Sequence, residues 1–387
     1  MKKVLFVLLA LALVGGFVFA QDEEAKPAPK VVFTGGVYTG AVLTFVDGAD
    51  SPTLRDNHWD EGNGTRFKFN GAYTDGNYGL NFSFNVHLVH DTSVITDYPF
   101  LELGNKPELG WGSTYVWANF VNDIIRISAG NLDTVWNNDI RWDSFDYRDG
   151  LRLEIKPVIG PGNLDIGFTL PLYTPYQIGG KDVDVPVSAD NGPLDDTFPA
   201  LWNTAFGVKY DISGTFKAVT ALQLWPAGKK NPDLLFGVYL GDTVPVAGLK
   251  ISVEGKIAGL GADKTTTALL ERFAFSDKLI PLPGFAAFIG AHQTFETGKD
   301  NFKLRIEGQV SYKITPEITG YLYSYFESFT DFDGSLFFIR PRVTFAIGPK
   351  ATFGAQWAGS FYSDKTGATL TGTTKNEIAL IYGWSFE

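Results

Sequence analysis

The chain has 387 residues, a formal net charge of −11 and no cysteine. The acidic balance argues against a nucleic-acid partner, and the lack of cysteine excludes disulfides and a cysteine-linked lipid anchor. Aromatic residues make up 15% of the chain and glycines number 43, a composition typical of β-proteins with many strands.

The N-terminus has the pattern of an export signal. Lys2 and Lys3 precede an apolar run, Val4 to Val14, and small residues lead to Ala20. This predicts a signal peptide over residues 1–20, cleaved after Ala20. Residues 21–30 are acidic and then proline-rich, so we expect a short disordered leader. No later segment approaches the roughly 18 apolar residues of a membrane helix, and residues 31–387 are expected to form one domain.

Most of this domain alternates between apolar and polar residues, which predicts strands. Thr267–Ser276 is the weakest candidate; without it and a neighbour the count would be sixteen. The eighteen candidates are Val31–Val46, Thr65–Thr74, Tyr78–Leu88, Ser113–Val121, Ile124–Gly130, Gly150–Lys156, Asn163–Leu170, Asn203–Asp211, Thr215–Gln223, Leu234–Leu240, Leu249–Ala258, Thr267–Ser276, Gly284–Phe295, Phe302–Tyr312, Glu317–Glu327, Ser335–Ala346, Lys350–Phe361 and Lys375–Phe386.

The connections between these strands alternate in length. Tight turns such as Asp75-Gly76-Asn77 and Ser213-Gly214 separate long connections over residues 48–64, 89–112, 131–149 and 171–202. Short turns at one end and long loops at the other are typical of an antiparallel barrel that crosses a membrane. The sequence therefore predicts an all-β transmembrane barrel of about eighteen strands.

The segment Phe302–Tyr312 shows which environment each face of such a strand would contact. Its apolar residues share one parity, whereas Lys303, Arg305 and Glu307 share the other. A charged side chain in hydrocarbon costs about 2–4 kcal/mol near the midplane of a bilayer. We therefore expect the apolar parity to face lipid and the charged parity to face a water-filled lumen. A β-sandwich alternates in the same way locally, but the strand number and loop lengths favour a barrel.

Cations concentrate on the lumenal parity, and acids concentrate in the long connections. The predicted pore-lining residues are Arg66, Lys68, Arg126, Arg152, Lys303, Arg305, Arg340 and Arg342. Cations on a wall that faces acidic loops would create a field across the pore. The alternative is that the acidic loops only keep the surface soluble, while the wall cations pair with Glu154, Glu254 and Glu307.

At two places the chain resembles the porins of bacterial outer membranes, of Gram-negative or spirochaete type. Residues 131–149 follow the fifth strand, and the resemblance implies that this loop folds into the barrel and narrows it. The alternative is an ordinary external loop whose aromatic residues pack together. The terminal strand Ile378–Phe386 is amphipathic and ends in aromatics, although Glu387 follows. The resemblance implies recognition of this strand by the barrel-assembly machinery, a periplasmic leader, an outer-membrane location and a possible homotrimer. The constriction candidates are Asp133, Asp139, Asp143 and Asp146.

Nothing in the sequence predicts catalysis. There are four histidines and no HExxH or GxSxG motif, so no enzyme activity, metal or cofactor is expected. The leading hypothesis is passive diffusion of small hydrophilic solutes or ions. One alternative is a sugar-selective channel, if Tyr321, Tyr323 and Tyr325 face the lumen rather than the lipid. Another is a surface adhesin or structural barrel that does not transport.

Overall fold

The computed structural model describes residues 29–47, 52–58, 62–63, 65–88, 107–111, 114–132, 149–171, 204–224, 231–241, 246–297, 302–328, 334–363 and 374–386. The expected signal peptide and leader lie outside these residues. So do the four aspartates predicted for the constriction, Asp133, Asp139, Asp143 and Asp146.

Within the described residues, eighteen strands build one antiparallel wall. They are β1 (Lys30–Val46), β4 (Thr65–Asp75), β5 (Tyr78–Leu88), β7 (Thr114–Phe120), β8 (Ile125–Asn131), β9 (Asp149–Ile155), β11 (Gly162–Pro171), β12 (Thr204–Ile212), β13 (Phe216–Leu224), β14 (Asp233–Leu240), β15 (Leu249–Ala258), β16 (Thr266–Ser276), β17 (Phe285–Glu296), β18 (Phe302–Lys313), β19 (Ile318–Ser328), β20 (Ser335–Ala346), β21 (Ala351–Tyr362) and β22 (Thr374–Phe386).

Four short strands accompany the wall: β2 (Thr53–His58), β3 (Gly62–Asn63), β6 (Pro107–Trp111) and β10 (Val158–Ile159). β6 pairs with the far half of β5 and so extends β7, and β2 pairs with the end of β1. The sequence pattern did not predict them, because β2, β3 and β6 lie in the long connections and β10 has only two residues in the short connection between β9 and β11.

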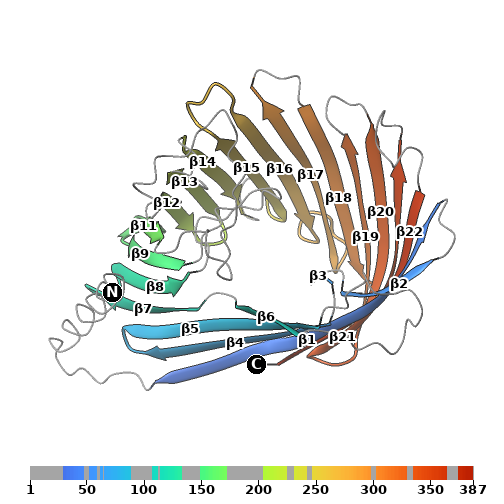
Figure 1. Cartoon of the computed structure of the whole chain (residues 1–387), viewed down its shortest axis with the longest axis horizontal. Helices are drawn as coiled ribbons and strands as arrows, with labels where there is room; N and C mark the ends of the chain where they lie inside the picture. The colour runs from blue at the N-terminus through green and yellow to red at the C-terminus, as the bar shows by residue number, and fades with distance from the viewer. Residues whose placement is uncertain are drawn as a thin grey trace.

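The wall closes on itself. β1 pairs with β22 from Gly35 opposite Phe386 to Val46 opposite Lys375. Figure 1 shows the result, with β1 in blue beside β22 in red and the other strands forming a ring around an open centre. Closure removes the free strand edges, which is the condition for crossing a bilayer with strands. The predicted eighteen-strand antiparallel barrel is confirmed, and the sixteen-strand alternative is wrong because β16 is a full wall strand.

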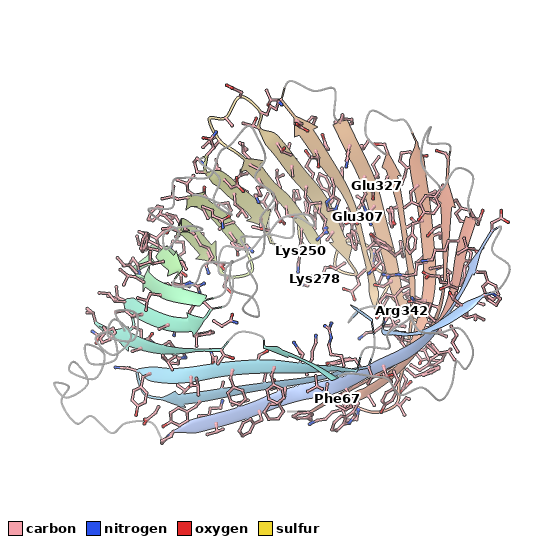
Figure 2. The ribbon with its side chains drawn as sticks, viewed as in Figure 1. Phe67, Lys250, Lys278, Glu307, Glu327 and Arg342 are labelled. Atoms are coloured by element: carbon pink, nitrogen blue, oxygen red, sulfur yellow. The ribbon has the colours of Figure 1, made fainter. Side chains whose placement is uncertain are left out.

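The distribution of side chains over the two faces is the reverse of that in a water-soluble protein. On β18, Arg305 and Glu307 face inward and are 6% and 5% exposed, whereas Ile306 between them faces outward and is 45% exposed. Figure 2 shows the same arrangement elsewhere: Lys250 and Arg342 project toward the enclosed space, and Phe67 lies on the outside. An apolar outer surface of this extent is stable when lipid covers it.

Glycines form the tight turns at one end of the barrel, called the turn end below. Gly76 and Gly214 have φ of +57° and +71°, which favours glycine, and both lie in predicted turns. The described residues contain no helix long and apolar enough to span a membrane.

Candidate functional site

A cluster of polar and aromatic side chains lies on the inner face of β16 to β19. It contains Arg272 of β16, His292 of β17, Arg305 and Glu307 of β18, and Tyr323 of β19. In the register, Gly290 stands between Arg272 and Glu307. Because glycine has no side chain, Arg272 reaches across β17 to the carboxylate.

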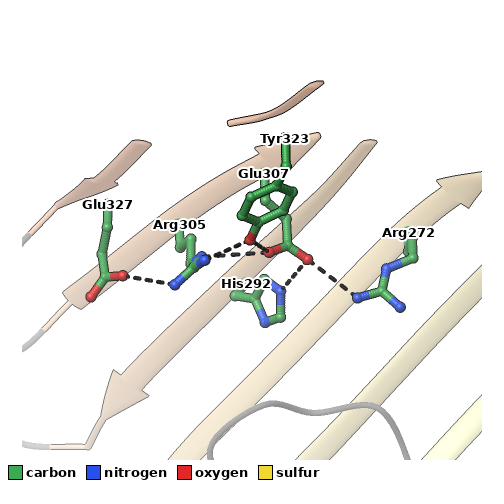
Figure 3. Close-up of polar contacts among 6 residues, drawn as sticks. All are labelled: Arg272, His292, Arg305, Glu307, Tyr323 and Glu327. Carbon is green, nitrogen blue, oxygen red and sulfur yellow. Dashed lines mark hydrogen bonds and ion pairs between the residues drawn. The ribbon is translucent and has the colours of Figure 1, made fainter. Parts of the chain in front are cut away.

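Glu307 is the centre of this cluster (Figure 3). Its Oε1 accepts hydrogen bonds from His292 Nε2 at 3.1 Å and from Arg272 Nη2 at 3.2 Å. Its Oε2 accepts one from the Tyr323 hydroxyl at 2.7 Å, and Arg305 Nε lies 3.5 Å from the same oxygen. A buried carboxylate is tolerated only when opposite charges and donors surround it, and Glu307 has both.

Arg305 joins the carboxylate to the aromatic part of the wall. Its Nη1 donates to Glu327 Oε2 at 3.2 Å, and its Nη2 donates to the Tyr323 hydroxyl at 2.7 Å. The guanidinium also lies over the Tyr325 ring, with Cζ 3.5 Å from the ring centroid. Tyr325 in turn stacks on Phe338 at a centroid distance of 4.9 Å. This arrangement holds the arginine in one orientation.

Two further arginines lie over tyrosines of β19. Arg340 is 5.1 Å from the centroid of Tyr323, and Arg342 is 5.7 Å from that of Tyr321. Tyr321, Tyr323 and Tyr325 therefore line the inner face together with the cations. The sequence left open whether they face lumen or lipid, and the structure places them inside.

Two hollows follow this part of the wall. One, of about 450 Å³, is bordered by Arg305, Arg340 and the aromatic rings of Phe288, Tyr325 and neighbouring residues. The other, of about 410 Å³, lies near the turn end and is bordered by Lys217, Tyr239 and Lys250. Lys217 lies 3.7 Å from the centre of the Tyr239 ring.

Arg272 borders both hollows, so the cations and aromatic rings that line them are neighbouring parts of one track along the wall. We call this track the arginine–tyrosine track. Its groups can hold an anion through the cations, and they can stack against the flat face of a sugar or an aromatic solute.

The predicted wall cations all lie on the inner face, but on two sides of the barrel. Lys303, Arg305, Arg340 and Arg342 belong to β18 and β20, beside the arginine–tyrosine track. The other four lie on β4, β8 and β9: Arg66, Lys68, Arg126 and Arg152. On that side Lys68 lies over Tyr38, Arg126 lies over Trp117, and Arg152 donates to Thr169 at 3.3 Å.

The alternative that cations and acids simply pair applies to part of the wall. Lys156 lies 2.9 Å from Glu154, and Lys256 lies 3.2 Å from Asp233 with both side chains buried.

Sequence reasoning missed Arg272, His292 and Glu327. Arg272 shares the inward parity of β16 and could have been found from it. The contacts of His292 and Glu327 depend on register, for which the sequence gave no signal.

No protein-family model and no curated protein sequence matches the chain. Solved structures do resemble it. An anion-selective porin from Comamonas acidovorans superposes with a TM-score of 0.55 at 11% identity, covering 92% of this chain and 100% of that one. OccAB3 from Acinetobacter baumannii gives 0.55 at 10% identity, with 92% and 100% covered. OpdQ from Pseudomonas aeruginosa gives 0.52 at 13% identity, with 92% and 98% covered.

Closure, an apolar exterior and a charged interior define a transmembrane β-barrel. The superpositions narrow the class further: the chain has the fold of the bacterial outer-membrane porins. At these identities the likeness concerns the fold.

Proposed function

We propose that the protein is an outer-membrane porin through which small hydrophilic solutes and ions diffuse passively. One observation carries the proposal: the inner face of a closed barrel is charged, while large apolar side chains occupy its outer face. Side chains are enough to fill the interior of a barrel of eight strands. A barrel of about eighteen strands is much wider, so its lumen has room for water. Such a wall selects solutes by size and charge.

The wall cations give this channel its charge preference. Arg66, Lys68, Arg126 and Arg152 on one side, with Lys303, Arg305, Arg340 and Arg342 on the other, attract anions into the lumen. The acids of residues 131–149 complete the proposed field if that loop folds inward as the porin resemblance implies. Asp133, Asp139, Asp143 and Asp146 lie outside the described residues, so this part stays a prediction.

Location and partners follow from the same proposal. The protein would lie in the outer membrane in contact with lipid, exported by its signal peptide and inserted by the assembly machinery through Ile378–Phe386. Supporting this, Phe386 joins an outward aromatic group, with its ring 6.1 Å from that of Phe69. Assembly as a homotrimer is part of the proposal.

Planar-bilayer recording tests the channel directly. Refolded full-length protein should produce stepwise conductance, and a protein that inserts without steps would refute the proposal. Replacing Arg305, Arg340 and Arg342 with glutamine should move the reversal potential in a salt gradient toward cation selectivity. An unchanged potential would exclude these three residues as the selective part of the wall.

A second candidate is a channel selective for sugars. The observation that favours it is the inward orientation of Tyr321, Tyr323 and Tyr325, with two of their rings beside a hollow of about 450 Å³. Aromatic rings stack against the apolar faces of sugars, and the adjacent arginines donate hydrogen bonds to hydroxyl groups. Block of the current by oligosaccharides that saturates with concentration supports this candidate, and block that stays linear excludes it.

A further inference from the structure

Small inward residues open a hollow near the turn end of the barrel, called the turn-end hollow below. Ser252 of β15 stands between Tyr239 of β14 and Arg272 of β16 in the register, and Ala274 of β16 stands opposite Lys250. These inward positions hold small residues beside long ones, so a space of about 410 Å³ remains along the wall. The inner face itself therefore forms the hollow.

Cations border the turn-end hollow from three strands. They are Lys217 of β13, Lys250 of β15 and Arg272 of β16, and Asp211 is the only acid among the described residues that line it. At about 4.8 Å for each strand, the outer two backbones lie about 14 Å apart, and long side chains let the charges approach one bound ion. Figure 2 shows Lys250 projecting toward the enclosed space, so this charge is accessible from the lumen.

Neither lysine has a carboxylate partner in the described part of the chain. Lys217 lies over the Tyr239 ring, and Lys250 forms no ion pair. Asp211 stands opposite Lys217 in the register but forms no ion pair with it. The hollow therefore contains two ammonium groups for which the described residues supply no direct counter-charge.

Other inward lysines of the same wall are paired. Lys209 of β12 lies 3.6 Å from Asp165, and Lys256 at the other end of β15 lies 3.2 Å from Asp233. The wall thus places a carboxylate beside these two lysines and places none beside the pair in the turn-end hollow. This difference indicates an anion that reaches the pair from the lumen.

We propose that the turn-end hollow binds the phosphate group of a small phosphorylated solute inside the proposed channel, on which this inference rests. A phosphate monoester carries a charge of about −1.5 to −2 at neutral pH and has three acceptor oxygens. Its charge matches Lys217 and Lys250 together, and the guanidinium of Arg272 suits phosphate oxygens. Ser252 can donate a further hydrogen bond from the base of the hollow. A carboxylate has one charge and two oxygens, so it would leave one ammonium group without a counter-charge.

Binding to refolded protein in detergent tests this site without requiring conduction. Full-length protein is titrated by calorimetry with glucose 6-phosphate, with gluconate, which has a carboxylate in place of the phosphate, and with uncharged glucose. The phosphate ester should bind roughly fivefold more tightly than gluconate, which corresponds to about 1 kcal/mol for the additional charge, and glucose should bind most weakly. Equal affinity for glucose 6-phosphate and gluconate would show that the hollow does not recognise phosphate and would overturn the proposal.

Variants locate the binding. Lys217→Gln and Lys250→Gln should each weaken the binding of glucose 6-phosphate roughly fivefold. Lys313→Gln is the matched control, because Lys313 is an exposed lysine at the turn end of β18 that does not border the hollow. Its loss should change the affinity by less than about twofold at physiological ionic strength, where solvent screens distant charges. If Lys313→Gln weakens binding as much as the other two, the overall charge of the barrel holds the ester and the proposal fails.

Two controls make the result specific. Circular dichroism verifies that the variants fold, and the comparison of the three solutes on the unchanged protein tests the proposal independently of any variant. Single-channel recording in potassium chloride separates this site from the channel itself. A protein that conducts but does not prefer the phosphate ester refutes the site alone, whereas a protein that inserts without conducting refutes the proposed function.

Discussion

Replacing Glu307 with glutamine separates the structural and the selective roles of the lumenal cluster. The carboxylate accepts hydrogen bonds from Arg272, His292 and Tyr323 and pairs with Arg305. The side chains of Glu307 and Arg305 are only 4% and 7% exposed. Glutamine presents an NH₂ group where the carboxylate accepted hydrogen bonds, so the arginines lose their counter-charge. Breaking a buried pair in this way costs about 3–5 kcal/mol.

The same substitution should raise the preference of the channel for anions. The interaction energy between the charge of Glu307 and a solute ion about 5 Å away in water is about 0.8 kcal/mol. The substitution removes this energy, which is unfavourable for anions and favourable for cations. That energy corresponds to about a fourfold change in relative occupancy, and the permeability ratio should move by up to this factor. The reversal potential in a salt gradient measures the ratio, and unfolding in urea, followed by tryptophan fluorescence in lipid vesicles, measures the stability.

Glu327→Gln is the matched control. It removes one negative charge from the same wall, but Glu327 contacts Arg305 alone among the cluster and its side chain is 28% exposed. Solvent screens a pair of this kind, so its loss should cost less than about 1 kcal/mol while the selectivity moves in the same direction. If Glu307→Gln unfolds at the same urea concentration as the parent, the buried network does not stabilise the barrel and the reasoning is refuted.

Three further predictions concern other parts of the wall. Tyr325→Ala should weaken block of the current by oligosaccharides severalfold, whereas Tyr312→Ala on the outer face should leave it unchanged; equal effects would place the binding elsewhere. A Cβ at Gly241 would clash with the backbone oxygen of Gly214 in the turn between β12 and β13, so Gly241→Ala should destabilise the barrel by about 1–3 kcal/mol in urea unfolding, and a neutral effect would show that the turn relaxes. Lys256→Met leaves the buried carboxylate of Asp233 without its cation and should cost about 3–5 kcal/mol in the same assay, a prediction that an unchanged midpoint contradicts.

The strands of the wall could be predicted from the sequence because one face of each strand contacts lipid and the other contacts water. Lipid excludes charge from every outward position, so strand after strand shows the same alternation, and Leu249–Ala258 and Ser335–Ala346 have the predicted bounds. The exception is instructive. β16 was the weakest prediction, and its outward row contains Glu271 between Leu269 and Phe273. Glu271 interrupts the run of apolar residues that the outward face of this strand would otherwise show.

The contacts within the cluster could not be predicted from the sequence. The alternation of residues along a strand shows on which face of the wall a side chain lies, but not which side chain of the next strand it contacts. A shift of two residues between β18 and β19 would keep every side chain on its side of the wall, yet Arg305 would no longer stand opposite Glu327. The turn fixes the register: Thr315 Oγ1 accepts hydrogen bonds from the backbone amides of Glu317 and Ile318 at 3.2 and 3.1 Å. Only the folded turn defines which residues of the two strands meet. The chemistry of the arginine–tyrosine track is therefore encoded partly at the turn end of the barrel, in residues that do not belong to the track.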